Sequence, residues 1–207
     1  MADIRINGKR FPSLQSLGVV NKLLEKLEQL SIKNRESITM LRINESEIDI
    51  SNEKLRTLKI DDTDKVEVRM ETPEKLSYES LNVALDMADL LLNDIKVSTL
   101  NLWNSEKDYE PTLETLIEDS YYFLSLAARP IYLLDANINS LAPDSEKCLR
   151  QLDKISDLLK NITYLSIKKQ NKDACHLLVA KVIPAIETWI GLSGSFAANL
   201  NLQYSSN

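Results

Sequence analysis

Apolar and polar residues alternate along much of the first 72 residues, whereas apolar residues recur every three or four positions from residue 73 onward. Alternation is typical of strands that bury one face, and recurrence at three and four is typical of helices with one apolar face. The change near residue 72 predicts an α+β protein with two domains, residues 1–72 and residues 73–207.

The first domain begins with a predicted β-hairpin and a helix. Residues 4–11 form two short alternating segments joined by Asn7-Gly8, a dipeptide typical of a two-residue hairpin turn. Apolar residues then recur at helical spacing, and Ser13 is a suitable N-cap. A helix is therefore expected to run from there to Leu30.

Two further strands are predicted after this helix. Residues 38–43 are rich in residues that favour strands, and residues 66–70 alternate again after a polar turn at residues 61–64. Residues 52–58 are expected to form a short helical turn or a loop. The predicted order is strand, strand, helix, strand, short element and strand.

This order resembles the β-grasp (ubiquitin-like) fold, on the evidence of the hairpin at residues 4–11, the helix at residues 14–30 and the last strand at residues 65–70. The resemblance implies that the last strand lies beside the first. Family members that act as sulfur carriers or modifiers expose a C-terminal Gly-Gly, whereas this chain continues from Met70 through Pro73 into a second domain. The resemblance thus implies a recognition module whose sheet face or edge binds a protein partner.

The second domain is predicted to contain four long helices, over residues 73–97, 111–140, 144–169 and 172–200. Their apolar residues are spaced four and three apart, as in helices that pack nearly antiparallel. The links between the last three helices are short, and short links force neighbouring helices to run antiparallel. The domain is therefore expected to be an antiparallel four-helix bundle.

Two prolines, Pro130 and Pro184, fall inside the second and fourth predicted helices. A proline inside a helix removes a backbone hydrogen bond and kinks or breaks the helix. Two interpretations are open. The kinks improve the wrapping of the bundle, or they open a pocket for a small apolar ligand, lined by Tyr122, Tyr132 and Trp189.

The link between the first two predicted helices, residues 98–110, is longer and contains Trp103 and Tyr109. Aromatic side chains exposed on a long loop often anchor a protein partner. We therefore expect Trp103 and Tyr109 to bind a partner. The alternative is that Trp103 packs back onto the end of the bundle.

The fourth predicted helix is apolar almost all round, because its polar residues between positions 177 and 192 are Lys181, Glu187 and Thr188. Such a helix must bury more than one face. The prediction is that it meets a second copy, with Ile186 or Ile190 facing the partner and with small residues, Gly191 and Gly194 among them, allowing close approach. A homodimer is expected.

Charge and hydropathy limit the partners and the cellular location that we expect. The net charge of −6 lies entirely in residues 73–207, since residues 1–72 carry 13 basic and 13 acidic residues. An acidic surface repels phosphate, so nucleic acid is not an expected partner. The longest apolar stretch, residues 177–192, is shorter than the ~20 residues that span a bilayer. A cytoplasmic protein without a membrane span or secretory signal is expected.

Candidate chemistry is sparse. The chain has a single histidine, His176, and two cysteines, Cys148 and Cys175, which lie at apolar helical positions and are expected to be buried free thiols. Asp173 and His176 stand three residues apart, but the second histidine that a di-iron bundle uses is missing. No catalytic residue, metal ligand or cofactor is therefore predicted.

The sequence thus predicts a non-enzymatic protein-interaction or scaffold protein that self-associates through its helical bundle. Two alternatives remain open at this point. One is a binding protein for a small apolar ligand held between kinked helices. The other is a secretion or assembly chaperone whose bundle clamps a helix of its client.

Overall fold

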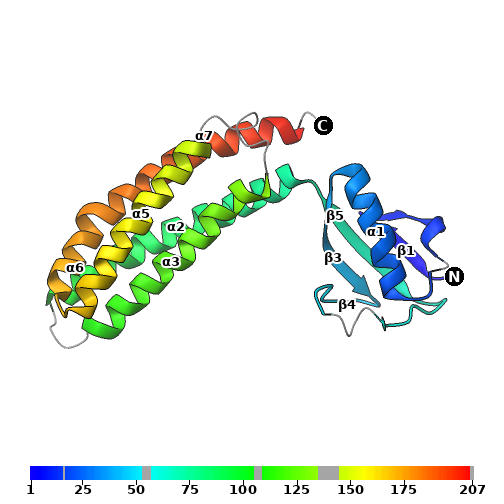
Figure 1. Cartoon of the computed structure of the whole chain (residues 1–207), viewed down its shortest axis with the longest axis horizontal. Helices are drawn as coiled ribbons and strands as arrows, with labels where there is room; N and C mark the ends of the chain where they lie inside the picture. Colours follow the sequence, from blue (N-terminus) through cyan, green and yellow to red (C-terminus); the bar gives the residue numbers. More distant parts are fainter. Residues whose placement is uncertain (16, 53–56, 105–108, 135–144, 206–207) are drawn as a thin grey trace. The chain divides into compact units, whose positions relative to one another are not determined.

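The computed structural model describes residues 1–15, 17–52, 57–104, 109–134 and 145–205, and only the backbone of residues 103–104, 109–111 and 201–205. The chain divides into two compact units, Met1–Pro73, here called the sheet unit, and Glu74–Asn207, here called the helical unit. The sheet unit contains a five-stranded mixed sheet, and the described elements of the helical unit are helices (Figure 1). The predicted α+β fold class is confirmed.

The five strands are β1 (Asp3–Ile6), β2 (Lys9–Arg10), β3 (Ser37–Ile43), β4 (Ser46–Glu47) and β5 (Lys65–Glu71). Their order across the sheet is β2-β1-β5-β3-β4. β1 and β5 run parallel, with Ile4 opposite Val66, and the other neighbours run antiparallel. The last strand therefore lies beside the first, at the centre of the sheet.

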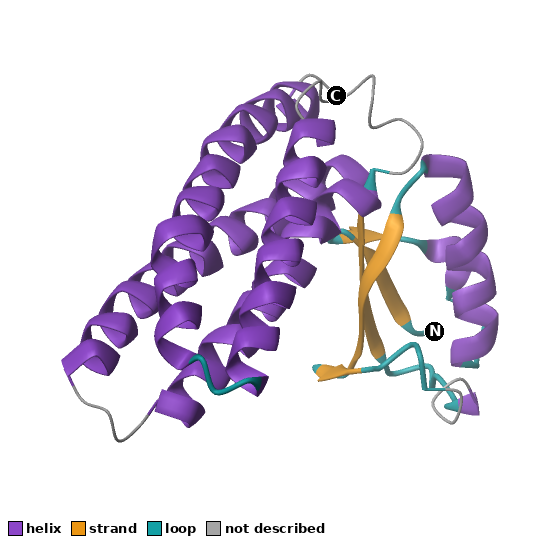
Figure 2. Ribbon diagram, turned by 60° about the vertical axis from the view of Figure 1, so that its left-hand side comes forward, coloured by secondary structure: helices purple, strands orange, loops and turns teal. Residues whose placement is uncertain are grey.

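One face of the sheet is covered by the helix α1 (Val20–Asn34), which Figure 2 shows alongside the strands. The helix and the strands bury apolar side chains against each other, as alternation in the strands and helical spacing in α1 dictate. This core includes Val20, Leu23, Leu24 and Leu27 of α1 and Ile4, Ile6, Leu41, Ile43, Val66, Val68 and Met70 of the strands.

The predicted start of this helix at Ser13 is wrong. Residues Pro12–Leu14 form one 3₁₀ turn, η1, and the α-helix begins only at Val20. Gly18 has a φ of +60°, a left-handed conformation that glycine adopts without steric cost and that interrupts a helix. Val19 forms an isolated antiparallel β-bridge with Lys59 immediately before α1 starts.

A polar turn joins two ends of the sheet. The Nδ2 group of Asn44 donates to Oδ1 of Asp64 at 2.6 Å, and the backbone N–H of Lys65 donates to Oδ1 of Asn44 at 2.9 Å. These bonds place the start of β5 beside the end of β3. The bond from Asn44, with a second from the backbone of Asp61, lowers the pKa of the Asp64 carboxyl.

The helical unit contains α2 (Pro73–Asn104), α3 (Tyr109–Leu133), α5 (Ser145–Ile167), α6 (Asn171–Leu177), the π-helical segment η4 (Leu178–Val182) and α7 (Ile183–Ser205). All of them contribute to one apolar core. The predicted apolar stripes are largely buried there, including Leu81, Ala88, Leu92 and Ile95 of α2, Leu113, Leu116, Phe123 and Ala127 of α3, Cys148, Leu152, Ile155, Leu159 and Ile162 of α5, and Leu178, Val182, Ala185, Trp189 and Phe196 of the last helices.

The prediction of a long loop over residues 98–110 is wrong, because helices occupy most of this segment. α2 continues to Asn104 and α3 begins at Tyr109. Leu102 of this continued helix is buried in the core, which stabilises the extension, and Thr99 donates its hydroxyl to the carbonyl of Ile95. Pro111 falls in the first turn of α3, where a helix needs no backbone N–H.

The two internal prolines are accommodated in different ways. Before Pro184 the helix widens into the π-helical segment, in which the N–H of Ile183 bonds to the carbonyl of Leu178 five residues earlier. α3 continues through Pro130, and the hydroxyl of Ser77 in α2 donates to the carbonyl of Pro130 at 2.7 Å. The widened turn accommodates Pro184, whereas Ser77 satisfies the carbonyl of Pro130 itself, which lies in the last turn of α3.

Candidate functional site

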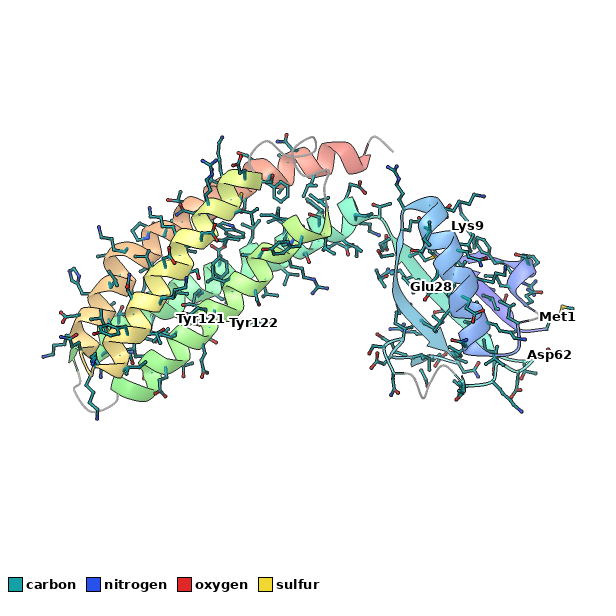
Figure 3. The ribbon with its side chains drawn as sticks, in the orientation of Figure 1. Met1, Lys9, Glu28, Asp62, Tyr121 and Tyr122 are labelled. Carbon is teal, nitrogen blue, oxygen red and sulfur yellow. The ribbon has the colours of Figure 1, made fainter. Side chains whose placement is uncertain are left out.

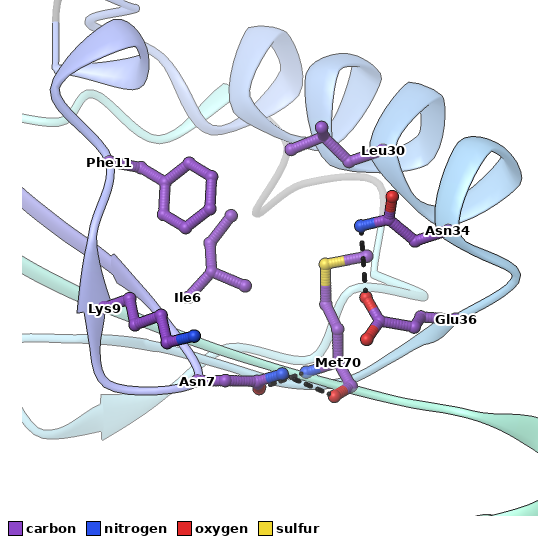
Figure 4. Close-up of a pocket in the computed structure, with 8 residues that line it drawn as sticks. All are labelled: Ile6, Asn7, Lys9, Phe11, Leu30, Asn34, Glu36 and Met70. Carbon is purple, nitrogen blue, oxygen red and sulfur yellow. Dashed lines mark hydrogen bonds between the residues drawn. The ribbon is translucent and has the colours of Figure 1, made fainter. Parts of the chain in front are cut away.

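The sheet unit carries a pocket between the β1–β2 hairpin, the C-terminal end of α1 and the end of β5 (Figure 4). Apolar side chains of Ile6, Phe11, Leu30 and Met70 face into it, and Asn7, Lys9, Asn34 and Glu36 form its polar rim. Residues separated by more than sixty positions in the chain meet here because β1 and β5 are neighbours in the sheet.

The hairpin side of the pocket is held in place by Asn7. This residue has a φ of 49° in the turn before Gly8, a left-handed conformation that asparagine tolerates better than most residues. Its side chain donates to the carbonyl of Met70 and accepts from the N–H of Met70, both at 2.9 Å. The amide thereby pairs with β5 as a further strand residue would, and fixes the hairpin over the end of that strand.

The helix side of the pocket is shaped by the end of α1. Arg35 adopts a φ of 55°, and the N–H of Glu36 bonds to the carbonyl of Ser31 at 3.1 Å. The hydroxyl of Ser31 donates back to the carbonyl of Glu36, and Asn34 donates to the Glu36 carboxylate at 3.4 Å. This capped helix end holds Glu36 at the rim.

The volume and lining of the pocket indicate what it can hold. Its volume is about 220 Å³, below the roughly 300–1,000 Å³ of typical sites for small-molecule ligands. Ile6 and Met70 are buried at its base, whereas Phe11 and Leu30 are half-buried and present apolar surface. Lys9 is exposed, and no ion pair to it is found among the described residues. The pocket thus suits one apolar side chain with a carboxylate beside it.

The open face of the sheet is charged, but its charges largely face each other. One row crosses all five strands, and it consists of Arg10, Arg5, Glu67, Arg42 and Glu47. Arg42 pairs with Glu47 at 3.6 Å, and Asp3 pairs with both Arg5 and Arg10 at about 3 Å. Exposed pairs of this kind contribute little stability, and they leave this face less charge for a partner than its composition suggests.

The predicted partner-binding aromatics cannot be placed on a surface. Trp103 belongs to the last turn of α2, and Tyr109 is the first residue of α3. Their side chains lie outside the described residues. The structure therefore places both residues in helices rather than in a loop, and describes no contact that they make.

The residues predicted to mediate self-association fall on different sides of α7. Ile186 is fully buried in the core, and Ile190 is half-buried and packs against that core. Gly191 and Gly194 are exposed, and no atom lies within 4 Å of the position that a Cβ would occupy on either glycine. The geometry thus separates the two isoleucines from the two glycines.

The apolar excess of the last helices faces inward. Their large apolar side chains are buried or half-buried. The outer side carries small or polar residues, namely His176, Ala180, Lys181, Pro184, Glu187, Thr188, Gly191, Gly194, Ser195 and Ala198. The small outer residues explain why this sequence looks apolar all round.

Sequence reasoning missed an exposed apolar line on α2. Val83, Leu90 and Val97 are 54%, 62% and 49% exposed, and they recur seven residues apart, which places them on one side of the helix. The seven-residue spacing of these three residues is visible in the sequence. The apolar stripe that forms the core recurs with the same period, so spacing alone does not distinguish the exposed line from the buried stripe.

The space between α3 and α7 is filled by aromatic side chains. Phe123 and Trp189 are fully buried and pack edge to face, with ring centroids 5.2 Å apart. Tyr122 and Tyr132 lie on the surface instead, and Figure 3 shows Tyr121 and Tyr122 projecting from α3. The three residues expected to line an apolar ligand pocket therefore do not come together.

The reactive side chains are scattered. Cys148 and Cys175 are buried free thiols, as predicted, and burial raises the pKa of the Cys175 thiol, which disfavours the reactive thiolate. His176 is exposed. Among the residues that the structure describes, no three His, Cys, Asp or Glu side chains are grouped so as to hold a metal ion.

One helix in the described part of the chain, Asn171–Leu200, is long and apolar enough to cross a membrane by length and composition, with a mean hydropathy of 1.4 over 18 residues. A core helix of a soluble protein passes the same test. Trp189, Phe196 and Leu200 of this helix are fully buried among the other helices.

Comparison of the chain with protein-family models, with curated proteins and with solved structures finds no match.

Proposed function

We propose that this protein is a non-enzymatic interaction protein, in which a β-grasp-like sheet unit binds a protein partner and an antiparallel four-helix bundle brings copies of the chain together. The observation that carries the proposal is the pocket of the sheet unit, with its apolar base and its charged rim. Pockets that receive an anchoring side chain are where protein interfaces gain most of their affinity.

The partner side chain is expected to be a large aliphatic or aromatic residue next to an acidic one. The apolar part contacts Phe11 and Leu30, which are only half-buried without a partner. The carboxylate reaches Lys9, which forms no ion pair within the described residues. Glu36 on the opposite rim disfavours a second acidic residue there, so the pocket also selects the orientation of the partner segment.

A peptide-display selection on the full-length protein tests this proposal. Selected peptides are expected to share an apolar residue beside Asp or Glu. Leu30→Glu places a charge in the pocket and is expected to weaken their binding at least about tenfold, a loss of ~1.4 kcal/mol. Ile32→Glu is the matched control, because Ile32 lies two residues away in the same helix and is 82% exposed.

Circular dichroism of both variants shows whether the fold is retained. If both folded variants bind the peptides like the parent protein, the pocket is not the binding site. A selection that yields no shared pattern contradicts recognition of an anchoring side chain.

Self-association through the helical unit is the second part of the proposal. It is supported by large side chains that remain exposed on this unit, including Val83, Leu90 and Val97 of α2 and Tyr122 and Tyr132 of α3. Light scattering from micromolar to millimolar concentration measures it. A mass of 23.5 kDa, that of one chain, at every concentration contradicts it.

A further inference from the structure

The charges of the helical unit are divided unevenly between α2 and α3 on the one hand and α5, α6 and α7 on the other. α2 and α3 together carry nine acidic and three basic residues. Residues 145–205, which contain α5, α6 and α7, carry five acidic and eight basic residues. The net charges are −6 and +3, so the first group of helices is acidic and the second is basic.

The acidic side combines unpaired carboxylates with exposed apolar side chains. Asp86 and Asp94 of α2 and Glu114 and Glu118 of α3 are exposed, and no ion pair to them is found among the described residues. The bond from Ser77 to Pro130 places the start of α2 level with the end of α3. Because both helices rise 1.5 Å per residue, Tyr122 lies level with Leu85, between the exposed Val83 and Leu90. We call the exposed surface of α2 and α3 that carries these residues the acidic surface.

The basic side lies between α5 and α7. Gln151 of α5 donates to the carbonyl of Ala185 at 2.8 Å, which places these two residues level. Lys154, three residues after Gln151, is therefore level with Val182, beside Lys181. Both lysines are exposed, and no ion pair to them is found in the described part of the chain. We call the exposed surface that carries these two lysines the basic surface.

The acidic and the basic surface lie on opposite sides of the helical unit. Ser77 links α2 to α3, Gln151 links α5 to α7, and Lys96 of α2 pairs with Glu187 of α7 at 3.5 Å. The helices thus follow the order α2, α3, α5, α7 around the core. The two surfaces are then separated by the core itself.

We propose that the acidic surface of one molecule docks on the basic surface of a second copy. The inference rests on the self-association proposed above and assigns its surfaces. A second copy suits the charges, because two acidic surfaces repel each other whereas an acidic and a basic surface attract. Such a contact is head-to-tail, since each molecule uses different surfaces for its two neighbours. It leaves one free surface at each end and extends into a ring or a chain of copies.

Two pairs of charge reversals test this arrangement in the full-length protein. Asp86→Lys with Glu118→Lys changes the acidic surface, and Lys154→Glu with Lys181→Glu changes the basic surface. Each variant alone carries two surfaces of like charge and is expected to scatter light as a 23.5 kDa monomer. An equimolar mixture places opposite charges at both contacts, with the signs exchanged at one of them, and is expected to associate again beyond the monomer mass.

Lys22→Glu with Lys33→Glu, at exposed positions of α1, is the matched control and is expected to retain the mass of the parent. The parent protein is expected to grow beyond a pair as concentration rises and to dissociate as salt rises from about 0.05 to 0.5 M, because salt screens exposed charges. Circular dichroism confirms that each variant is folded.

The possible results separate this inference from the proposed function. A parent protein that is monomeric at all concentrations contradicts both. A parent that associates while both charge-reversed variants keep its mass, or that stops at a salt-insensitive pair, overturns the assignment of the two surfaces and leaves self-association standing. Charge-reversed variants that are monomeric both alone and when mixed overturn the head-to-tail geometry.

Discussion

Polar turn residues align the strands of the sheet unit, whereas apolar stripes align the helices of the helical unit. In the sheet unit, Asn7 bonds to both backbone groups of Met70, and Asn44 bonds to Lys65. In the helical unit, Phe123 and Trp189 meet at the centre of a large apolar core. The comparison indicates that single turn residues determine how the strands of the sheet unit align. In the helical unit, the volume buried in the core determines how the helices pack.

The largest expected effect comes from removing volume in the helical unit. Trp189→Ala deletes a fully buried indole that packs against Phe123 and should reduce the free energy of unfolding by about 3–5 kcal/mol. Urea denaturation followed by far-ultraviolet circular dichroism measures it. Trp189→Phe keeps most of the volume and should cost clearly less. A loss below about 1 kcal/mol for Trp189→Ala would mean that the core there is not closely packed.

A smaller but still substantial effect is expected at a turn of the sheet unit. Asn7→Ala loses two hydrogen bonds to Met70, worth about 1 kcal/mol each, and places alanine at a positive φ, which costs about 1–2 kcal/mol more. Asn7→Gly removes the same bonds but tolerates the φ. Faster hydrogen exchange at β5 should appear in both variants, more strongly with alanine. Equal exchange in the two variants would mean that the backbone conformation contributes nothing.

Removal of a polar link in the helical unit should reduce the free energy of unfolding less than either change above. Ser77→Ala leaves the carbonyl of Pro130 without its buried partner, and an unsatisfied buried group costs about 1–3 kcal/mol. The loss should be measured by urea denaturation, with Ser125→Ala, at an exposed position of α3, as the control. If Ser77→Ala is neutral, apolar packing alone determines how α2 and α3 meet, and the comparison becomes sharper.

The smallest expected change is a gain in stability. Gly191→Ala adds a methyl group where nothing lies within 4 Å, and alanine is favoured over glycine in a helix by about 0.5–1 kcal/mol. For a chain of this length, that gain raises the melting temperature by about 1–4 °C. Scanning calorimetry measures it. A melting temperature that falls below that of the parent only as the protein concentration rises would place Gly191 in a contact between copies.

Much of the fold follows from local patterns. The alternation in β1 and β5, the Asn7-Gly8 turn and the stripes of the long helices each depend on neighbouring residues, so the sequence predicts them. The start of α1 could not be predicted in the same way, because apolar spacing continues through Leu17 while Gly18 turns the backbone left-handed.

The candidate site was beyond prediction for a different reason. Its lining comes from the hairpin, from the end of α1 and from β5, and these meet only because of the strand order. The outward line on α2 was hidden because Val83, Leu90 and Val97 recur with the same period as the buried stripe, and only burial distinguishes the two. The burial of Ile186 follows from the packing of α7 against its neighbours, which the sequence of α7 does not contain.

The short outer strands of the sheet have a consequence for aggregation at high protein concentration. β2 and β4 have two residues each, and three of these four residues are charged. An incoming chain finds no long, flat row of free backbone groups to pair with, and charged side chains oppose its approach. High local concentrations of the protein therefore carry little risk of strand-to-strand aggregation, and an extended peptide gains little by adding to the sheet.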